Sequence, residues 1–247
     1  MLNRMHRKSR LIISVNAKLL LATCVCALSV SGCGKYPEPL RTAEDIERAP
    51  AETEMLSVGA LPLADFSRLE RFDNVRQLKF YQSDGTGASD AKLKALASMS
   101  FPKLRDVSLL NCPFVTDLGL VALTNIPSIE LLQLEGTSIS DQSLEIIAAH
   151  LHLKGINVAN CTNVTFDGIS ALAEVSSLRE LTFSSDNLTQ DQVISLISRM
   201  KEVQWCSIVD RAGTLDEDAI KRAAGSQMKS ISVSRKGALQ TMKEAQD

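Results

Sequence analysis

Apolar residues recur along the chain with a constant internal spacing from Val75 onward. Each recurrence holds a triplet of apolar residues at offsets 0, 3 and 5, as in Leu104, Val107 and Leu109. The last two residues of a triplet share one face of a short strand, because side chains alternate between the two faces. The spacing therefore predicts a series of similar strand units. Their triplets begin at Val75, Leu104, Ile129, Leu153, Leu178, Val203 and Met228.

A short helix is predicted after each of the first six triplets. It opens on a residue with N-cap chemistry, and two apolar residues follow four and seven positions later, as at Leu120 and Leu123. The same spacing reaches Ile220 and Ala223 in the sixth unit. One strand and one helix cannot bury both apolar faces alone, so the units are expected to stack on one another. The predicted caps are Ser89, Thr116, Ser140, Thr165, Thr189 and Asp216.

This pattern resembles that of leucine-rich repeat proteins of the cysteine-containing subtype, over Val75 to about Val233. Residues 104–123 and 153–172 are most similar to the LxxLxLxxC pattern of that subtype. The resemblance implies an α/β fold, a right-handed solenoid whose parallel strands line a concave face and whose helices lie on the convex side. It also implies protein recognition as the usual activity.

The chain departs from the subtype at several positions. Thr137, Asp186 and Arg211 stand where the subtype has Cys or Asn, and Phe166 replaces the acidic residue that follows the cap. The chain also lacks an F-box, so the ubiquitin-ligase role of the F-box members does not transfer. Only the architecture is carried over by the resemblance.

Residues 1–32 resemble a bacterial lipoprotein signal peptide. They hold five basic residues and no acidic one, and the apolar run at 19–30 is too short to span a bilayer comfortably. The run is followed by Ser31, Gly32 and Cys33, as in the lipobox, where a cysteine receives diacylglyceride before cleavage on its amino side. Cys33 is therefore the predicted lipid attachment site. The alternative is an ordinary signal peptide followed by a chance cysteine.

The mature chain is predicted to have three further parts. Residues 33–54 carry three prolines and little that could be buried, which predicts a flexible tether. Residues 55–74 are more apolar and are expected to form an N-terminal cap, and 75–247 form a leucine-rich-repeat domain of about seven coils. We expect the protein in the bacterial cell envelope, anchored to a membrane by lipid. By analogy, Gly34 favours the outer membrane or the periplasmic face.

The charge of the mature chain argues against two classes of partner. Loss of residues 1–32 removes five of the 27 Lys and Arg and none of the 29 Asp and Glu, so the net charge is near −7. That charge disfavours nucleic acid, which needs a basic surface, and electrostatic docking on anionic lipid. Membrane attachment would therefore depend on the acyl chains.

The cysteines and histidines of the mature chain predict no catalytic or metal site. Cys112 and Cys161 fall in the same column two coils apart, so their backbones should be more than about 9 Å apart, beyond the roughly 7 Å limit for a disulfide. Cys206 falls at an inward strand position, and all three are predicted to be buried free thiols. His150 and His152 have no Cys or acidic residue at a ligand spacing. We expect no enzyme activity, no cofactor and no metal.

The concave face is the remaining candidate for function. Residues at offsets 2 and 4 of each triplet point away from the core, and most of them are small or polar. A few apolar side chains on the strands or just past them are exceptions, and one acidic residue lies beside the single tryptophan. The alternative is that the apolar residues tuck under loops or pack on one another. The candidate protein-binding residues are Trp205, Tyr81, Leu110, Leu131, Val209 and Glu180.

Two functions of different classes remain open. The first is a membrane-tethered interaction module that binds an unknown protein or peptide partner on its concave face. The second is a structural or self-associating spacer of the cell envelope with no specific ligand. Changes on the concave face discriminate between them, because a binder would lose its partner and a spacer would be unaffected.

Overall fold

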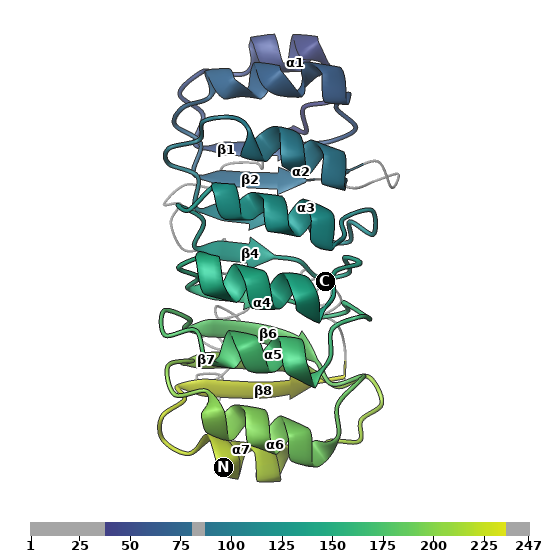
Figure 1. The fold of residues 1–247 in the computed structure, drawn as a ribbon, viewed down its shortest axis with the longest axis vertical. Helices are drawn as coiled ribbons and strands as arrows, with labels where there is room; N and C mark the ends of the chain where they lie inside the picture. The colour runs from purple at the N-terminus through teal and green to yellow at the C-terminus, as the bar shows by residue number, and fades with distance from the viewer. Residues whose placement is uncertain (1–37, 81–86, 236–247) are drawn as a thin grey trace, which may run out of the picture. The chain divides into compact units, whose positions relative to one another are not determined.

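A computed structural model describes residues 38–80 and 87–235. Within them the chain forms one parallel sheet of eight strands whose spatial order is the order of the sequence. Figure 1 shows the strands stacked one above the next, with the helices on one side of the sheet. The strands are β1 (Met55–Val58), β2 (Gln77–Phe80), β3 (Asp106–Ser108), β4 (Leu131–Gln133), β5 (Gly155–Asn157), β6 (Glu180–Ser184), β7 (Trp205–Val209) and β8 (Ser230–Ser234).

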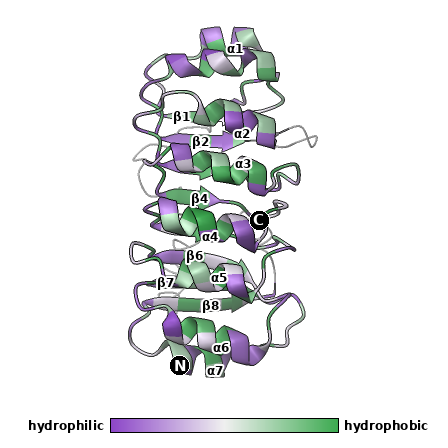
Figure 2. Cartoon of the chain, viewed as in Figure 1, coloured by the Kyte–Doolittle hydropathy of each residue, from purple (hydrophilic) through white to green (hydrophobic). Residues whose placement is uncertain are grey.

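Helices connect successive strands, and each of the six predicted caps is the N-cap of a helix. Figure 2 shows hydrophilic and hydrophobic residues together on these helices, as expected where one side of a helix covers a sheet. The apolar pairs are buried as predicted, except that Ala224 replaces Ala223 in the buried position of the last helix. The helices are α1 (Ala43–Arg48), η1 (Leu63–Arg71), α2 (Asp90–Ala97), α3 (Asp117–Ala122), η2 (Leu123–Asn125), α4 (Asp141–His150), α5 (Phe166–Ala173), α6 (Gln190–Arg199) and α7 (Glu217–Ala224).

The strand register confirms the predicted units. The offset-3 residues of all seven triplets lie opposite one another across the sheet, from Leu78 in β2 to Ile231 in β8. Their side chains and the paired helix residues form one continuous apolar core. Strand β1 adds a further unit, since Leu56 pairs with Leu78. The N-terminal cap expected at 55–74 is thus itself a coil of the solenoid, with a strand and the helix η1.

The flexible tether predicted for 33–54 was wrong for residues 40–49, which are folded onto the first coil. Leu40 and Ile46 are buried in the core, and the backbone N–H of Leu40 donates to the Ser57 carbonyl at 2.8 Å. Helix α1 opens on a capping box formed by Thr42 and Asp45. The prolines predicted a tether, but two apolar residues and a capping box are enough to cover the open end of the core. Residues 33–37 of that prediction lie outside the described part of the chain.

The strands end in two different ways along the sheet. After β3, β4 and β5 the chain turns through Asn111, Gly136 and Asn160, whose φ angles are positive at 54°, 72° and 60°. Asn and Gly tolerate this conformation best. Each turn is followed by Cys112, Thr137 or Cys161, and all three side chains are buried.

Strands β6 and β7 instead continue for five residues, and the buried position is taken one residue earlier. Ser185 and Asp210 are the buried residues, while Asp186 and Arg211 are exposed and their side chains lie 3.8 Å apart. The repeat pattern therefore assigned Asp186 and Arg211 to a buried position that the preceding residue fills in each case. The pattern is shifted because neither strand is followed by a positive-φ residue.

Carboxylates connect the helices on the convex side. Asp117, the first residue of α3, accepts hydrogen bonds from the backbone N–H and the hydroxyl of Ser140, at 2.8 and 2.6 Å. Asp90 accepts the same two bonds from Thr116, and Asp141 accepts them from Thr165. Each aspartate thus holds the N-cap of the following coil. We call these three pairs the carboxylate ladder.

The ladder explains two glycines in the helices. A Cβ on Gly119 would lie 2.4 Å from an Asp90 carboxylate oxygen, and one on Gly168 would lie 2.3 Å from an Asp141 carboxylate oxygen. The ladder ends at Phe166, which has no carboxylate to offer. Thr189 instead forms a capping box with Gln192 of its own helix.

Candidate functional site

The concave face is the side of the sheet away from the helices, and its predicted columns are confirmed by the strand register. The offset-2 residues pair across the sheet in one row, and the offset-4 residues pair in a second row. The first row reads Gln77, Asp106, Leu131, Gly155, Glu180, Trp205 and Ser230. The second reads Lys79, Ser108, Gln133, Asn157, Thr182, Ser207 and Ser232.

Four neighbouring residues of the first row, Leu131, Gly155, Glu180 and Trp205, form what we call the central row. The side chains of Leu131 and Glu180 lean from opposite sides over Gly155. A Cβ on Gly155 would lie 2.7 Å from Leu131 Cδ2 and 3.7 Å from Glu180 Oε2. The missing side chain of Gly155 therefore lets a leucine methyl and a carboxylate approach one another on the face.

Glu180 is half-buried, and its carboxylate has no hydrogen-bond or ion-pair partner within the described residues. Burial raises the pKa of its carboxyl group, with no opposing contribution from a donor or a cation. Its register partners are Gly155 on one side and Trp205 on the other. In the row, Glu180 therefore stands between Leu131, which lies beyond Gly155, and Trp205.

Trp205 is half-buried in the same row. The ammonium group of Lys229 lies 4.7 Å from the centre of its ring, within the range of a cation–π contact. Lys229 immediately precedes Ser230, the β8 partner of Trp205, so it approaches the ring from the side away from Glu180.

The other carboxylate of the row, Asp106, is already bonded. Gln77 Nε2 donates to Asp106 Oδ2 at 2.7 Å. Burial raises the pKa of Asp106, and the Gln77 hydrogen bond opposes that rise. Asp106 and Glu180 are thus both partly desolvated, but of the two only Asp106 has a donor among the described residues.

A row of basic residues follows the N-terminal edge of the strands, and the sequence analysis missed it. The offset-1 residues there are basic in five of seven coils. Glu130 joins two of them, at 2.7 Å from Arg105 and 2.9 Å from Lys154. Reading the offset-1 column beside the other two would have revealed the row. Its basic members are Arg76, Arg105, Lys154, Arg179 and Lys229.

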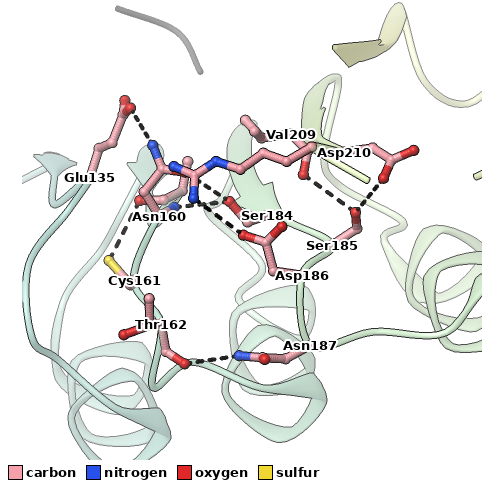
Figure 3. A network of polar contacts seen from close by, with 12 residues as sticks. Glu135, Asn160, Cys161, Thr162, Ser184, Ser185, Asp186, Asn187, Val209 and Asp210 are labelled. Carbon is pink, nitrogen blue, oxygen red and sulfur yellow. Dashed lines mark hydrogen bonds and ion pairs between the residues drawn. The ribbon is translucent and has the colours of Figure 1, made fainter. Parts of the chain in front are cut away.

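A polar network lies at the opposite edge, where β4, β5 and β6 end (Figure 3). Glu135 is 2 % exposed and accepts hydrogen bonds from Asn160 Nδ2 at 2.8 Å and Asn157 Nδ2 at 3.3 Å. The Asn160 backbone N–H donates to the Ser184 hydroxyl at 2.9 Å. Burial raises the pKa of Glu135, and the two asparagines and the charge of Arg211 oppose that rise.

Asp210 closes the neighbouring turn after β7. Its carboxylate accepts hydrogen bonds from the backbone N–H groups of Gly213 and Leu215 at 3.1 and 3.0 Å, and from the Ser185 hydroxyl at 3.3 Å. Figure 3 shows Ser185 between Val209 and Asp210, bonded to both. Because these groups satisfy one another, we assign them a structural role at the ends of the strands.

The structure places the candidate protein-binding residues unevenly. Trp205, Leu131 and Glu180 come together in the central row, and Leu110 lies half-buried just beyond β3. Val209 is 3 % exposed, so its assignment to the exposed surface was wrong. Strand β7 continues to Val209, which pairs with Ser184 on one side and Ser234 on the other. Tyr81 and the lipid-attachment residue Cys33 lie outside the described residues.

The three cysteines of the described chain are buried and unpaired, as predicted. Burial raises the pKa of the Cys206 thiol to about 12, which makes it a poor nucleophile. No group of three or more His, Cys, Asp or Glu residues in the described ranges could hold a metal ion. None of the helices in those ranges is long and apolar enough to cross a membrane.

The described residues thus form a leucine-rich-repeat solenoid, and the solved structure of a leucine-rich repeat-containing protein supports this fold. The chain is similar to the leucine-rich repeat-containing protein LegL7 from Legionella pneumophila, with a TM-score of 0.52 and 16% identity over 74% of this chain and 68% of that one. It is also similar to internalin C2 from Listeria monocytogenes, with a TM-score of 0.47 and 13% identity over 81% of this chain and 78% of that one. No family model matches the chain. At these identities the similarity is one of fold.

Proposed function

We propose that the protein is a lipid-anchored interaction module that binds a protein or peptide partner on its concave face. The observation that carries this proposal is the central row. It combines a half-exposed leucine, the only tryptophan of the chain and a carboxylate without a partner among the described residues. Tryptophan is among the residue types most enriched in interface hot spots.

The solenoid itself does not require these side chains. Core packing uses the inward residues of the strands and the apolar pairs of the helices, and Leu131, Glu180 and Trp205 are not among them. Leaving a carboxylate partly desolvated and unpaired opposes folding rather than favouring it. Such a group is better explained by a contact made with another molecule.

The anchor proposed at Cys33 would keep the module close to a membrane. Six residues separate Cys33 from Leu40, whose backbone is already bonded to β1. Such a segment can span at most about 25 Å even when fully extended. A lipid-anchored chain would therefore hold its N-terminal coil near the bilayer, with the central row several coils farther along.

The test is capture of a partner by chemical crosslinking on intact cells, followed by quantitation with variants. Trp205→Ala should reduce capture about thirtyfold, which corresponds to the roughly 2 kcal/mol typical of a hot-spot tryptophan. Its thermal midpoint should stay within a few degrees of the native value, because the ring is not part of the core. Leu118→Ala is the matched control, since it removes an apolar side chain that is 66% exposed on helix α3.

Two outcomes would oppose the proposal. Loss of stability in Trp205→Ala with capture unchanged would make the ring a structural cover for the last coils. Capture that survives substitution of Leu131, Glu180 and Trp205 together would favour the envelope spacer, which has no use for a specific concave surface.

A further inference from the structure

This inference deepens the proposed function and rests on it. We propose that Glu180 binds a basic side chain of the partner protein, an arginine or a lysine, between Leu131 and Trp205. The concave face would thus recognise a partner by one buried cation. Four lines of structural evidence support this assignment.

The first is that every other carboxylate along the sheet is paired within the described residues. Asp106 has Gln77, Glu130 has Arg105 and Lys154, and Glu135 has two asparagines. Asp210 has the backbone of its own turn. Glu180 alone has no donor among them. A half-buried carboxylate without a donor opposes folding unless a group outside the described residues supplies one.

The second is that the nearby cations are engaged elsewhere. Arg179 lies 3.5 Å from Glu202 and also donates to the carbonyls of Ser176 and Leu178. Lys154 is 2.9 Å from Glu130. Lys229 lies over the Trp205 ring. None of these three cations neutralises Glu180, so a counter-charge would have to come from outside the described residues, and we assign it to a ligand.

The third is the apolar frame around the carboxylate. In the row, Leu131 lies on one side of Glu180, with a methyl group over Gly155, and Trp205 is the residue on the other side. Arginine and lysine carry an apolar stem behind a charged head, so the stem can lie on these groups while the head reaches the carboxylate. A neutral donor could still bond to the carboxylate, but it would leave the charge uncompensated, whereas a guanidinium or ammonium group supplies both the donor and the opposite charge.

The fourth is the absence of a side chain at Gly155, which lies beneath the proposed site. Because it has no Cβ, Leu131 and Glu180 converge above the backbone of β5. A side chain at this position would push Leu131 away, since its methyl lies 2.7 Å from the place of a Cβ. The glycine therefore allows Leu131 and Glu180 to take up their positions in the proposed site.

The experiment uses the full chain and a single-arginine probe, acetyl-Gly-Arg-Gly-amide, at constant ionic strength. The probe with citrulline in place of arginine is the neutral control of nearly equal shape. Trp205 reports binding through its fluorescence and its indole N–H resonance, because it is the only tryptophan. The arginine probe should perturb both signals in a saturable way, and the citrulline probe should bind at least tenfold more weakly.

Glu180→Gln should weaken binding of the arginine probe at least tenfold. It keeps the shape of the side chain, and its thermal midpoint should equal or exceed the native one, because an unpaired charge is removed. Glu145→Gln makes the same chemical change on an exposed residue of helix α4 and should leave binding unchanged. Equal binding of both probes, or arginine binding unaffected by Glu180→Gln, would overturn the inference.

The same variants separate this inference from the proposed function. If Trp205→Ala abolishes capture of the crosslinked partner while Glu180→Gln retains it, the concave face binds a protein and the basic side chain is refuted. If the arginine probe binds through Glu180 but no partner is captured through the face, the cation site stands and the proposed function fails.

Discussion

Removing one carboxylate of the ladder should destabilise the solenoid far from the concave face. Asp117→Ala deletes the acceptor of two hydrogen bonds from Ser140, at 2.8 Å to the backbone N–H and 2.6 Å to the hydroxyl. These bonds join the coil that contains β3 to the coil that contains β4, at the start of helix α4. The Ser140 side chain makes no capping bond within its own helix, so Asp117 is the group that holds it.

The magnitude follows from the chemistry of these bonds. A hydrogen bond to a charged group contributes about 1.5–3 kcal/mol to stability. Because Asp117 and Ser140 are partly exposed, we take the lower end of that range for each of the two bonds. Water replaces part of what is lost, which leaves a destabilisation of about 2–3 kcal/mol. For a domain of this size that lowers the thermal midpoint by roughly 4–12 °C.

The effect of Asp117→Ala should also depend on pH. Burial raises the pKa of Asp117, but the hydrogen bonds from Ser140 and Ser143 outweigh it, so the pKa is lowered on folding. A carboxyl whose pKa is lowered on folding stabilises the protein above its unfolded pKa, about 3.9 for Asp, and loses that effect as the pH falls through the folded pKa. The gap between native and variant stability should be constant from pH 7 to 5 and shrink below about pH 4.

The assay is thermal unfolding followed by circular dichroism, with Asp167→Ala as the control. Asp167 is an exposed acidic residue in the first turn of α5, so its loss removes only a helix-dipole contribution of about 0.3–1 kcal/mol. If Asp117→Ala costs no more than Asp167→Ala, or if the gap is unchanged at pH 3, the ladder does not join the coils as argued.

Three further predictions concern the cysteines. Cys33→Ala should release the protein from membranes and remove the acyl mass from the intact chain; a variant that still partitions like the native protein would place the anchor elsewhere. Thiol labelling in denaturant without reductant should find three groups besides Cys33, namely Cys112, Cys161 and Cys206, whereas one group would mean a disulfide. Cys112→Asp should destabilise the fold by several kcal/mol through a buried unpaired charge, and Cys112→Ala far less.

The repeat could be predicted from the sequence because every coil makes the same demands on its residues. An inward strand residue, an N-cap and an apolar helix pair recur in each unit. A position that is ambiguous in one coil can therefore be assigned from the same position in the other coils. The register from Leu78 to Ile231 and all six caps followed from this repetition. The positions of Leu131, Glu180 and Trp205 in one row followed as well.

Features that occur once could not be predicted in this way. Leu40 and Ile46 cover the first coil without repeating any spacing, and the prolines around them indicated a tether instead. The longer strands β6 and β7 depend on the absence of a positive-φ residue after them. The sequence does differ at this position, which holds Asn111, Gly136 and Asn160 in three coils but Ser185 and Asp210 in the next two. The difference becomes a prediction only when it is known that this residue turns the chain with a positive φ.

The isolation of Glu180 could not be predicted either, because it depends on which neighbours pair with one another. The sequence places one basic residue on the preceding coil, Lys154, and one directly before Glu180, Arg179, which suggests a paired carboxylate. In the structure both cations turn to Glu130 and Glu202 on the N-terminal edge of the sheet. An unpaired carboxylate is thus a property of the folded arrangement and not of composition.

Stability and recognition are carried by different sides of this solenoid. The ladder and the apolar pairs hold the coils together on the helical side, while the central row contributes nothing to the core. Substitutions at Asp117 should therefore change stability without changing the concave face, and substitutions at Glu180 should do the reverse. Because distant sites of a protein behave almost additively, the double variant should show both effects at full size. A strong coupling between them would mean that the face is shaped by the ladder, and the two roles could not be assigned separately.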